Sequence, residues 1–160
     1  MAEGVIICLI PDKAYRDARP DVVDPHLTLA YFGRAAEQHP SAPSRLRSTV
    51  DRLALWAKPI NAVANGLAVF IDSPHSVMVD IVDSTALASM YVDLLHTYPN
   101  TNGSVALNRT HGFTPHMTLK KLDDADHVRL VVGDLERVEF TFTAVGLWYG
   151  DEKYEVEFHG

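Results

Sequence analysis

Pro25-His26-Leu27-Thr28-Leu29 recurs almost unchanged as Pro115-His116-Met117-Thr118-Leu119, once in each half of the chain. In both segments polar residues alternate with apolar ones, the pattern of a strand with one face in a core and the other face available for chemistry. A lone His-x-Ser/Thr carries little information: His39-Pro40-Ser41 is a third match, in a loop rich in proline and serine. The repeated pentapeptide on two strands is therefore the feature from which we interpret the chain.

Residues two apart on a strand point to the same face. His26 therefore projects with Thr28, and His116 projects with Thr118. If the two strands lie side by side, two imidazoles and two hydroxyls converge, an arrangement suited to phosphoryl chemistry. One neutral histidine would take a proton, the other as imidazolium would give one, and the hydroxyls would donate to phosphate oxygens. This chemistry needs no metal, and we expect no cofactor.

The pattern outside the repeat predicts an α+β chain of hairpins and helices. In chain order we expect strands at 5–10 and 27–32, a helix from about 41 that stops at Pro59, strands at 62–71 and 77–82, a helix capped by Asp83 or Ser84, a strand at 116–121 and a hairpin over 138–158, with 11–24 a connection, 100–114 a long loop and 123–135 undecided. This order favours largely antiparallel sheets over a doubly wound parallel fold. No linker divides the chain, so residues 1–160 are predicted to form a single domain.

Composition places the chain in the globular range. Its 160 residues are 47% apolar and 22% charged. Its apolar runs are too short to cross a bilayer, and Cys8, the one cysteine, excludes a disulfide framework. No secretory signal pattern is visible. We expect a monomer in the cytoplasm, without a membrane partner.

The distribution of charge bears on the choice of partner. The net charge is −7, and because residues 1–122 carry equal numbers of both signs, the excess lies in the last quarter of the chain. A broad basic footprint is missing, which argues against a long duplex nucleic acid. A small nucleotide or short oligonucleotide held in a local pocket fits this distribution.

The repeat resembles the paired motifs of the two-histidine phosphoesterase superfamily, which includes 2′-5′ RNA ligase-like proteins and cyclic phosphodiesterases. The first copy runs on to Gly33, where the family's first motif strand usually ends, and basic residues follow the second. The resemblance implies a bilobal fold with pseudo-twofold symmetry, in which a central cleft carries both motifs. It also implies metal-independent cleavage of phosphodiesters, usually 2′,3′-cyclic phosphates or 2′-5′ linkages. Some phage members degrade cyclic oligonucleotide signals of bacterial immunity, and a viral chain would act in the host cytoplasm.

Further residues are candidates for binding the substrate. Strand alternation puts Lys120 on the face of Thr118, and an irregular strand would bring Lys121 there instead. Arg109 and Phe113, just before the second motif, could hold a phosphate and a base. Trp148 and Tyr149 point to opposite faces of the last hairpin, so one of them could reach the cleft; we select Tyr149. Each candidate also has an interpretation without function. The two lysines could be exposed on an edge strand, Arg109 and Phe113 could belong to an ordinary surface loop, and Tyr149 could pack in the core.

Two other functions compete with a phosphodiesterase. A non-catalytic module could sequester a nucleotide in the same cleft, although a pure binder has no need of two titrating imidazoles. A metallohydrolase would need ligand spacings such as HExxH or paired cysteines, and the chain has neither. Activity that survives a chelator would exclude the metallohydrolase, and recovery of unchanged ligand would identify a binder.

Overall fold

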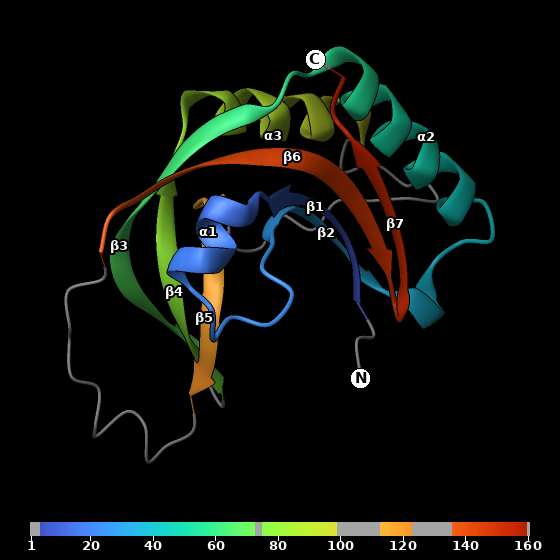
Figure 1. The fold of residues 1–160 in the computed structure, drawn as a ribbon. Coiled ribbons are helices and arrows are strands. Elements are labelled where there is room, and N and C mark those ends of the chain that lie inside the picture. Colours follow the sequence, from blue (N-terminus) through green and yellow to red (C-terminus); the bar gives the residue numbers. More distant parts are fainter. Residues whose placement is uncertain (1–3, 73–74, 99–112, 123–135, 160) are drawn as a thin grey trace.

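The computed structural model describes residues 4–72, 75–98, 113–122 and 136–159 (Figure 1). In chain order the elements are β1 (Gly4–Pro11), α1 (Lys13–Ala18), β2 (Leu27–Arg34), a 3-10 turn (Ala35–Glu37), α2 (Ala42–Trp56), β3 (Ile60–Asp72), β4 (His75–Asp83), α3 (Thr85–Thr97), β5 (His116–Leu122), β6 (Val138–Tyr149) and β7 (Glu152–Glu157). The predicted strands and both predicted long helices are confirmed. The predicted loop at 100–114 lies mostly outside the described residues, and the undecided stretch at 123–135 lies wholly outside them.

All described strands belong to one antiparallel sheet in the order β1-β2-β5-β4-β3-β6-β7. The start of β6 pairs with β3, and its remainder pairs with β1, so six strands form a closed circuit. The circuit consists of two equivalent halves of three strands each. In one half β1 lies between β2 and β6, and in the other half β4 lies between β5 and β3. The predicted α+β class with antiparallel sheets is thus confirmed, whereas a cleft between two lobes stays a prediction.

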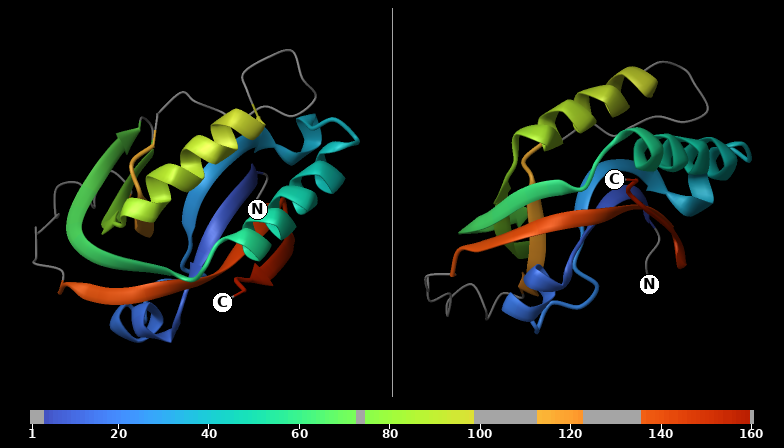
Figure 2. Two further views of the ribbon diagram at one scale, coloured as in Figure 1. Left: turned by 90° about the horizontal axis from the view of Figure 1, so that it is seen from above. Right: turned by 45° about the horizontal axis from the view of Figure 1, so that its top comes forward.

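Helices α2 and α3 lie together over one face of the curved sheet (Figures 1 and 2). The helical stripe predicted from Leu46, Val50 and Leu53 packs in the main core. Leu87 and Leu94 of α3 are fully buried in the same cluster. Burial of these stripes fixes which face of each strand looks inward, and the alternate residues are left for the opposite face.

Residues 11–24 are more than the predicted connection, because they contain α1. Asp12 caps this helix, its carboxylate accepting from the Ala14 amide at 3.2 Å, and Tyr15 is fully buried. A helix of six residues with one buried side chain shows too little periodicity to be recognised in sequence. The connection predicted at 11–24 therefore contains a helix that the sequence pattern did not indicate.

A buried ionic cluster ties α1 to β4. Arg19 Nε and the Tyr15 hydroxyl both donate to Asp80 Oδ2 at 3.2 Å, and Asp80 is fully buried. Burial raises the pKa of Asp80, while Arg19 and Tyr15 oppose that shift. Because α1 follows β1 directly, the cluster links the beginning of the chain to the strand beside β5.

Within the described residues, no helix is long and apolar enough to span a membrane.

Candidate functional site

The two motif strands meet at a single point of the sheet. Leu27 of β2 pairs with Met117 of β5 in antiparallel register, and both side chains are fully buried in the main core. One step further along this register, His26 lies opposite Thr118, and Thr28 lies opposite His116. Residues that face each other across an antiparallel pair have Cβ atoms about 4.5–5.5 Å apart. The four residues of the repeat therefore share one face, opposite to the face that packs against α2 and α3.

Both imidazoles are held in the same way. His26 Nδ1 lies 2.9 Å from the Asp24 carbonyl oxygen, and His116 Nδ1 lies 2.6 Å from the Thr114 carbonyl oxygen. A carbonyl oxygen only accepts, so Nδ1 carries the hydrogen in each ring. In the neutral ring Nε2 then carries the lone pair, and in the charged ring it carries an acidic N–H. Each histidine is thus prepared to exchange a proton through Nε2.

The backbone before His26 takes an unusual conformation. Asp24 has φ +48°, in the left-handed region that aspartate tolerates better than most residues. This residue supplies the carbonyl that holds His26 and also carries a charged side chain at the edge of the site. Asp24 is therefore a positioning residue that the sequence patterns did not reveal.

Trp148 packs against His26. Their ring centroids are 4.1 Å apart and the ring planes are tilted by 50°. Lys153, the partner of Trp148 in the β6–β7 register, places Nζ 4.2 Å from the indole centroid and 3.1 Å from Asp24 Oδ2. His26, Trp148, Lys153 and Asp24 thus form a closed ring of contacts around the first imidazole.

Space for Trp148 depends on Gly146. A Cβ atom at this glycine would stand 3.2 Å from Trp148 Nε1 and 3.3 Å from Cys8 Sγ. Trp148 Nε1 donates to Glu155 Oε2 at 2.9 Å, which holds the indole on the site face of the hairpin. A side chain at position 146 would crowd this arrangement.

The environment of His26 favours its neutral form. Burial lowers the pKa of this histidine below its ordinary value, and the positive charges of Lys153 and His116 lower it further. The carbonyl and the carboxylate of Asp24 act in the opposite direction. Because burial is the largest cause, the pKa of His26 is lowered overall, and this suits a group that must accept a proton near neutral pH.

A cavity of about 370 Å³ opens beside His26. Its lining includes Asp24, Trp148, Asp151 and Lys153. The volume is within the range of small-molecule sites, about 300–1,000 Å³. In the described part of the chain, no group of three or more His, Cys, Asp or Glu side chains is placed to hold a metal ion.

The predicted basic residues of β5 lie beyond an irregularity. The pairing of β4 with β5 shifts register between Met78 and Val79, so that Val79 pairs with Thr118 and Met78 pairs with Lys120. The simple alternation that put Lys120 on the face of Thr118 is interrupted at this point. Lys120 is exposed, and Lys121 pairs with Val77 along the same strand.

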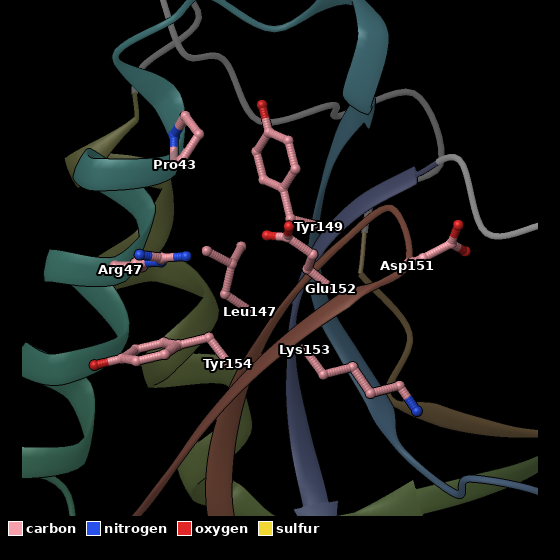
Figure 3. A pocket seen from close by; sticks show the side chains of 8 residues that line it. All are labelled: Pro43, Arg47, Leu147, Tyr149, Asp151, Glu152, Lys153 and Tyr154. Atoms are coloured by element: carbon pink, nitrogen blue, oxygen red, sulfur yellow. The ribbon is translucent and has the colours of Figure 1, made fainter.

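The predicted aromatic residues Phe113 and Tyr149 do not line the cavity beside His26. Phe113 stacks on Tyr91 of α3, with ring centroids 4.4 Å apart and planes 8° from parallel. Tyr149 lines a different cavity between α2 and the β6–β7 hairpin (Figure 3). Arg109 lies outside the described residues. Of the two neighbouring aromatics on β6, it is Trp148 that contacts the first motif.

Sequence reasoning missed Asp24 and Lys153 and passed over Trp148. A carboxylate two residues before a motif histidine is a local signal that could have been used. The other two residues depend on hairpin register and on the pairing of β1 with β6, which no local pattern of the chain encodes.

Comparison with known proteins gives a family and several similar folds, of which two are described. The profile of the 2′-5′ RNA ligase superfamily matches residues 10–153, which include both motifs. The fold is similar to that of TT0787 of Thermus thermophilus, with a TM-score of 0.62 and 15% identity over 98% of this chain and 100% of that one. It is also similar to Kluyveromyces marxianus Usb1, with a TM-score of 0.57 and 10% identity over 98% and 99% of the two chains. The curated protein sequences give no match. At these identities the two structures speak for the fold alone.

Proposed function

Because the chain belongs to the 2′-5′ RNA ligase superfamily, we propose that it is a metal-independent phosphodiesterase acting on a small cyclic or 2′-5′-linked nucleotide. One observation carries the proposal: β2 and β5 pair at Leu27 and Met117, so both motif histidines lie on one face, each with Nδ1 engaged by a carbonyl. Such a pair can take and give a proton within the same step.

The lowered pKa of His26 supports its role as the base. Its Nε2 takes a proton from the attacking water as the water oxygen bonds to phosphorus. The bond from phosphorus to one ribose oxygen breaks, and His116 Nε2–H protonates that leaving oxygen. The product is a phosphomonoester, and the two imidazoles return to their starting states by exchanging protons with solvent. In this mechanism the hydroxyls of Thr28 and Thr118 donate to the non-bridging oxygens.

The size and charge of the site support a small substrate. The cavity beside His26 holds about 370 Å³, and its lining carries the carboxylates of Asp24 and Asp151 as well as the Lys153 amine. Lys153 is already paired with Asp24. A long polyanion gains little from such a surface, whereas one phosphate flanked by imidazoles needs few further cations. A 2′,3′-cyclic phosphate, a 2′-5′ dinucleotide and a small cyclic oligonucleotide are all of suitable chemistry.

Product analysis by chromatography in EDTA tests the proposal. The panel contains 2′,3′-cyclic mononucleotides, 2′-5′ and 3′-5′ dinucleotides, and cyclic di- and trinucleotides. We expect turnover by the wild type and a loss of about 10²–10⁴-fold in His26→Ala and His116→Ala, the usual contribution of general acid–base catalysis. His39→Ala is the matched control, because His39 belongs to the unrelated third His-x-Ser match in an exposed loop.

Other results would contradict the proposal in recognisable ways. Activity that disappears in EDTA and returns with a metal would refute metal independence. Retention of one ligand without chemical change would identify the sequestering module instead. Equal activity in the His39→Ala and His26→Ala variants would remove the paired imidazoles from the mechanism.

A further inference from the structure

The cavity lined by Tyr149 lies on the other face of the sheet from the histidines. It holds about 680 Å³ between the start of α2 and the β6–β7 hairpin, and we name it the hairpin pocket (Figure 3). Leu147 and Tyr149 line it, whereas Trp148 between them contacts His26. The two cavities therefore lie on opposite faces of β6 and approach each other at the β6–β7 turn, where Asp151 and Lys153 line both.

Arg47 is a cation in the lining of the hairpin pocket, and it contacts an aromatic ring there. The Arg47 guanidinium carbon lies 5.5 Å from the centroid of the Tyr154 ring. Asp51, one turn further along α2, is the usual pairing partner for such an arginine. Its Oδ1 instead accepts from the Tyr154 hydroxyl at 2.5 Å. Among the described residues no carboxylate pairs with Arg47 within 4.0 Å, so its N–H groups can be offered to a phosphate or carboxylate as a two-pronged donor.

The remaining walls suit a flat, aromatic ligand with a polar edge. Pro43 and Leu147 are apolar, and the Tyr149 ring is partly exposed to the pocket. Stacking on an aromatic ring is the general way in which proteins bind a nucleobase without reading its sequence. Glu152 extends beside Tyr149, whereas Asp151 and the Lys153 amine are directed away from Arg47 (Figure 3). A carboxylate beside Tyr149 accepts from exocyclic amino groups, so an amino-bearing base edge fits there better than a phosphate does.

We propose that the hairpin pocket binds a second nucleotide, with its phosphate at Arg47, its base against Tyr149 and an amino-bearing base edge toward Glu152. The choice of a nucleotide over another aromatic anion rests on the proposed function. The ligand has two possible sources, a free mononucleotide or another nucleotide of the same substrate. Lys153 lines both the hairpin pocket and the cavity beside His26, so the two sites share a wall.

Calorimetry and NMR titration of the intact protein test the second site without any need for activity. The probes are 5′-AMP, 5′-GMP, 5′-UMP and inorganic phosphate. We expect AMP or GMP to bind and to shift resonances of Arg47 and Tyr149. Arg47→Gln should weaken binding at least about tenfold, as the loss of a charge-assisted contact predicts. Arg16→Gln, at an exposed arginine of α1, is the matched control and should bind as the wild type does.

Turnover by the same variants distinguishes the sources. If Arg47→Gln lowers kcat/KM for a 2′-5′ dinucleotide and not for a 2′,3′-cyclic mononucleotide, the pocket holds part of the substrate. If both substrates are unaffected while AMP binding is lost, the pocket takes a free nucleotide; either result supports the site. The site is refuted if Arg47→Gln binds normally, if phosphate alone binds as tightly as AMP, or if only resonances near His26 shift. A protein that binds AMP here but turns nothing over would retain this site and lose the proposed function.

Discussion

Lys153→Met is expected to move the acidic limb of the pH–rate profile to higher pH. Lys153 Nζ lies 4.2 Å from the Trp148 centroid, which lies 4.1 Å from the His26 centroid, so the charge is within 8.3 Å of that ring. At this distance two unit charges interact by about 0.5 kcal/mol in water and about 2 kcal/mol at an effective dielectric constant of about 20. Because the Lys153 side chain is 43% exposed, the lower half of this range applies best.

Removing this repulsion makes His26 easier to protonate. The proposed base is the neutral form of His26. Well below the pKa of His26 most of the enzyme carries the charged ring, and the fraction with a neutral ring falls by the Boltzmann factor of the lost interaction. The lower half of the range, about 0.5–1.2 kcal/mol, corresponds to a rate about 2- to 8-fold lower on the acidic limb, with little change on the neutral plateau. The measurement is kcat/KM as a function of pH, together with an NMR titration of the His26 ring.

Two variants control this experiment. Lys153→Arg keeps the charge and should keep the profile, while Lys13→Met removes an exposed lysine that pairs with Asp17 in its own helix. A Lys153→Met enzyme with an unshifted acidic limb and a raised KM would make Lys153 a substrate ligand. That result would refute the reasoning that it acts through His26.

Three further predictions concern the framework of the site. Leu27→Ala should lower the free energy of unfolding in urea by about 2–5 kcal/mol, because Leu27 is fully buried where the motif strands meet; a loss below about 1 kcal/mol would mean that this junction repacks freely. Asp80→Ala leaves the Arg19 charge buried without its partner and should lower the free energy of unfolding by about 3–5 kcal/mol. The control is Trp56→Ala on the exposed end of α2, which should change the free energy of unfolding by less than about 0.5 kcal/mol. The pKa of His26 in the folded protein lies below its ordinary value, so the free energy of unfolding should fall as the pH drops through about 6.5. In urea titrations at graded pH, His26→Ala should lack this contribution to the pH dependence of stability. An identical pH dependence in the variant would contradict the burial of this ring.

Local patterns were sufficient for the strands, for the two long helices and for the shared face of each motif. Period-two alternation set the orientation of His26 with Thr28, and the buried stripe of α2 followed from its helical spacing. The meeting of the two strands could only be assumed, since Leu27 and Met117 are distant in the chain and their pairing depends on the whole sheet. Whether Lys120 or Lys121 shares the face of Thr118 stays a prediction, because the register shift between β4 and β5 is a tertiary feature with no local marker.

The surroundings of the first motif were beyond prediction for a similar reason. Trp148 reaches His26 only because β6 pairs with β1, and Lys153 reaches Asp24 only because the hairpin register sets it opposite Trp148. Neither contact is implied by residue type. Alternation did predict that only one of the two adjacent aromatics on β6 could face the site, but the choice between them needed the register.

The repeat gives both motifs the same residues, but the fold gives their histidines different neighbours. Strand β7 pairs with β6 beside the first motif, and in the described part of the chain β3, the counterpart of β6, has no such added strand. Lys153 and the carboxylates of Asp24, Asp151 and Glu155 near the Trp148–His26 pair all come from this hairpin or from the turn that it contacts. Paired catalytic groups acquire distinct acid and base roles when their environments separate their pKa values. The β7 hairpin therefore provides the asymmetry that distinguishes His26 from His116, and the Lys153→Met profile tests its direction: a base at His26 moves the acidic limb, whereas an acid at His26 would extend activity on the basic side.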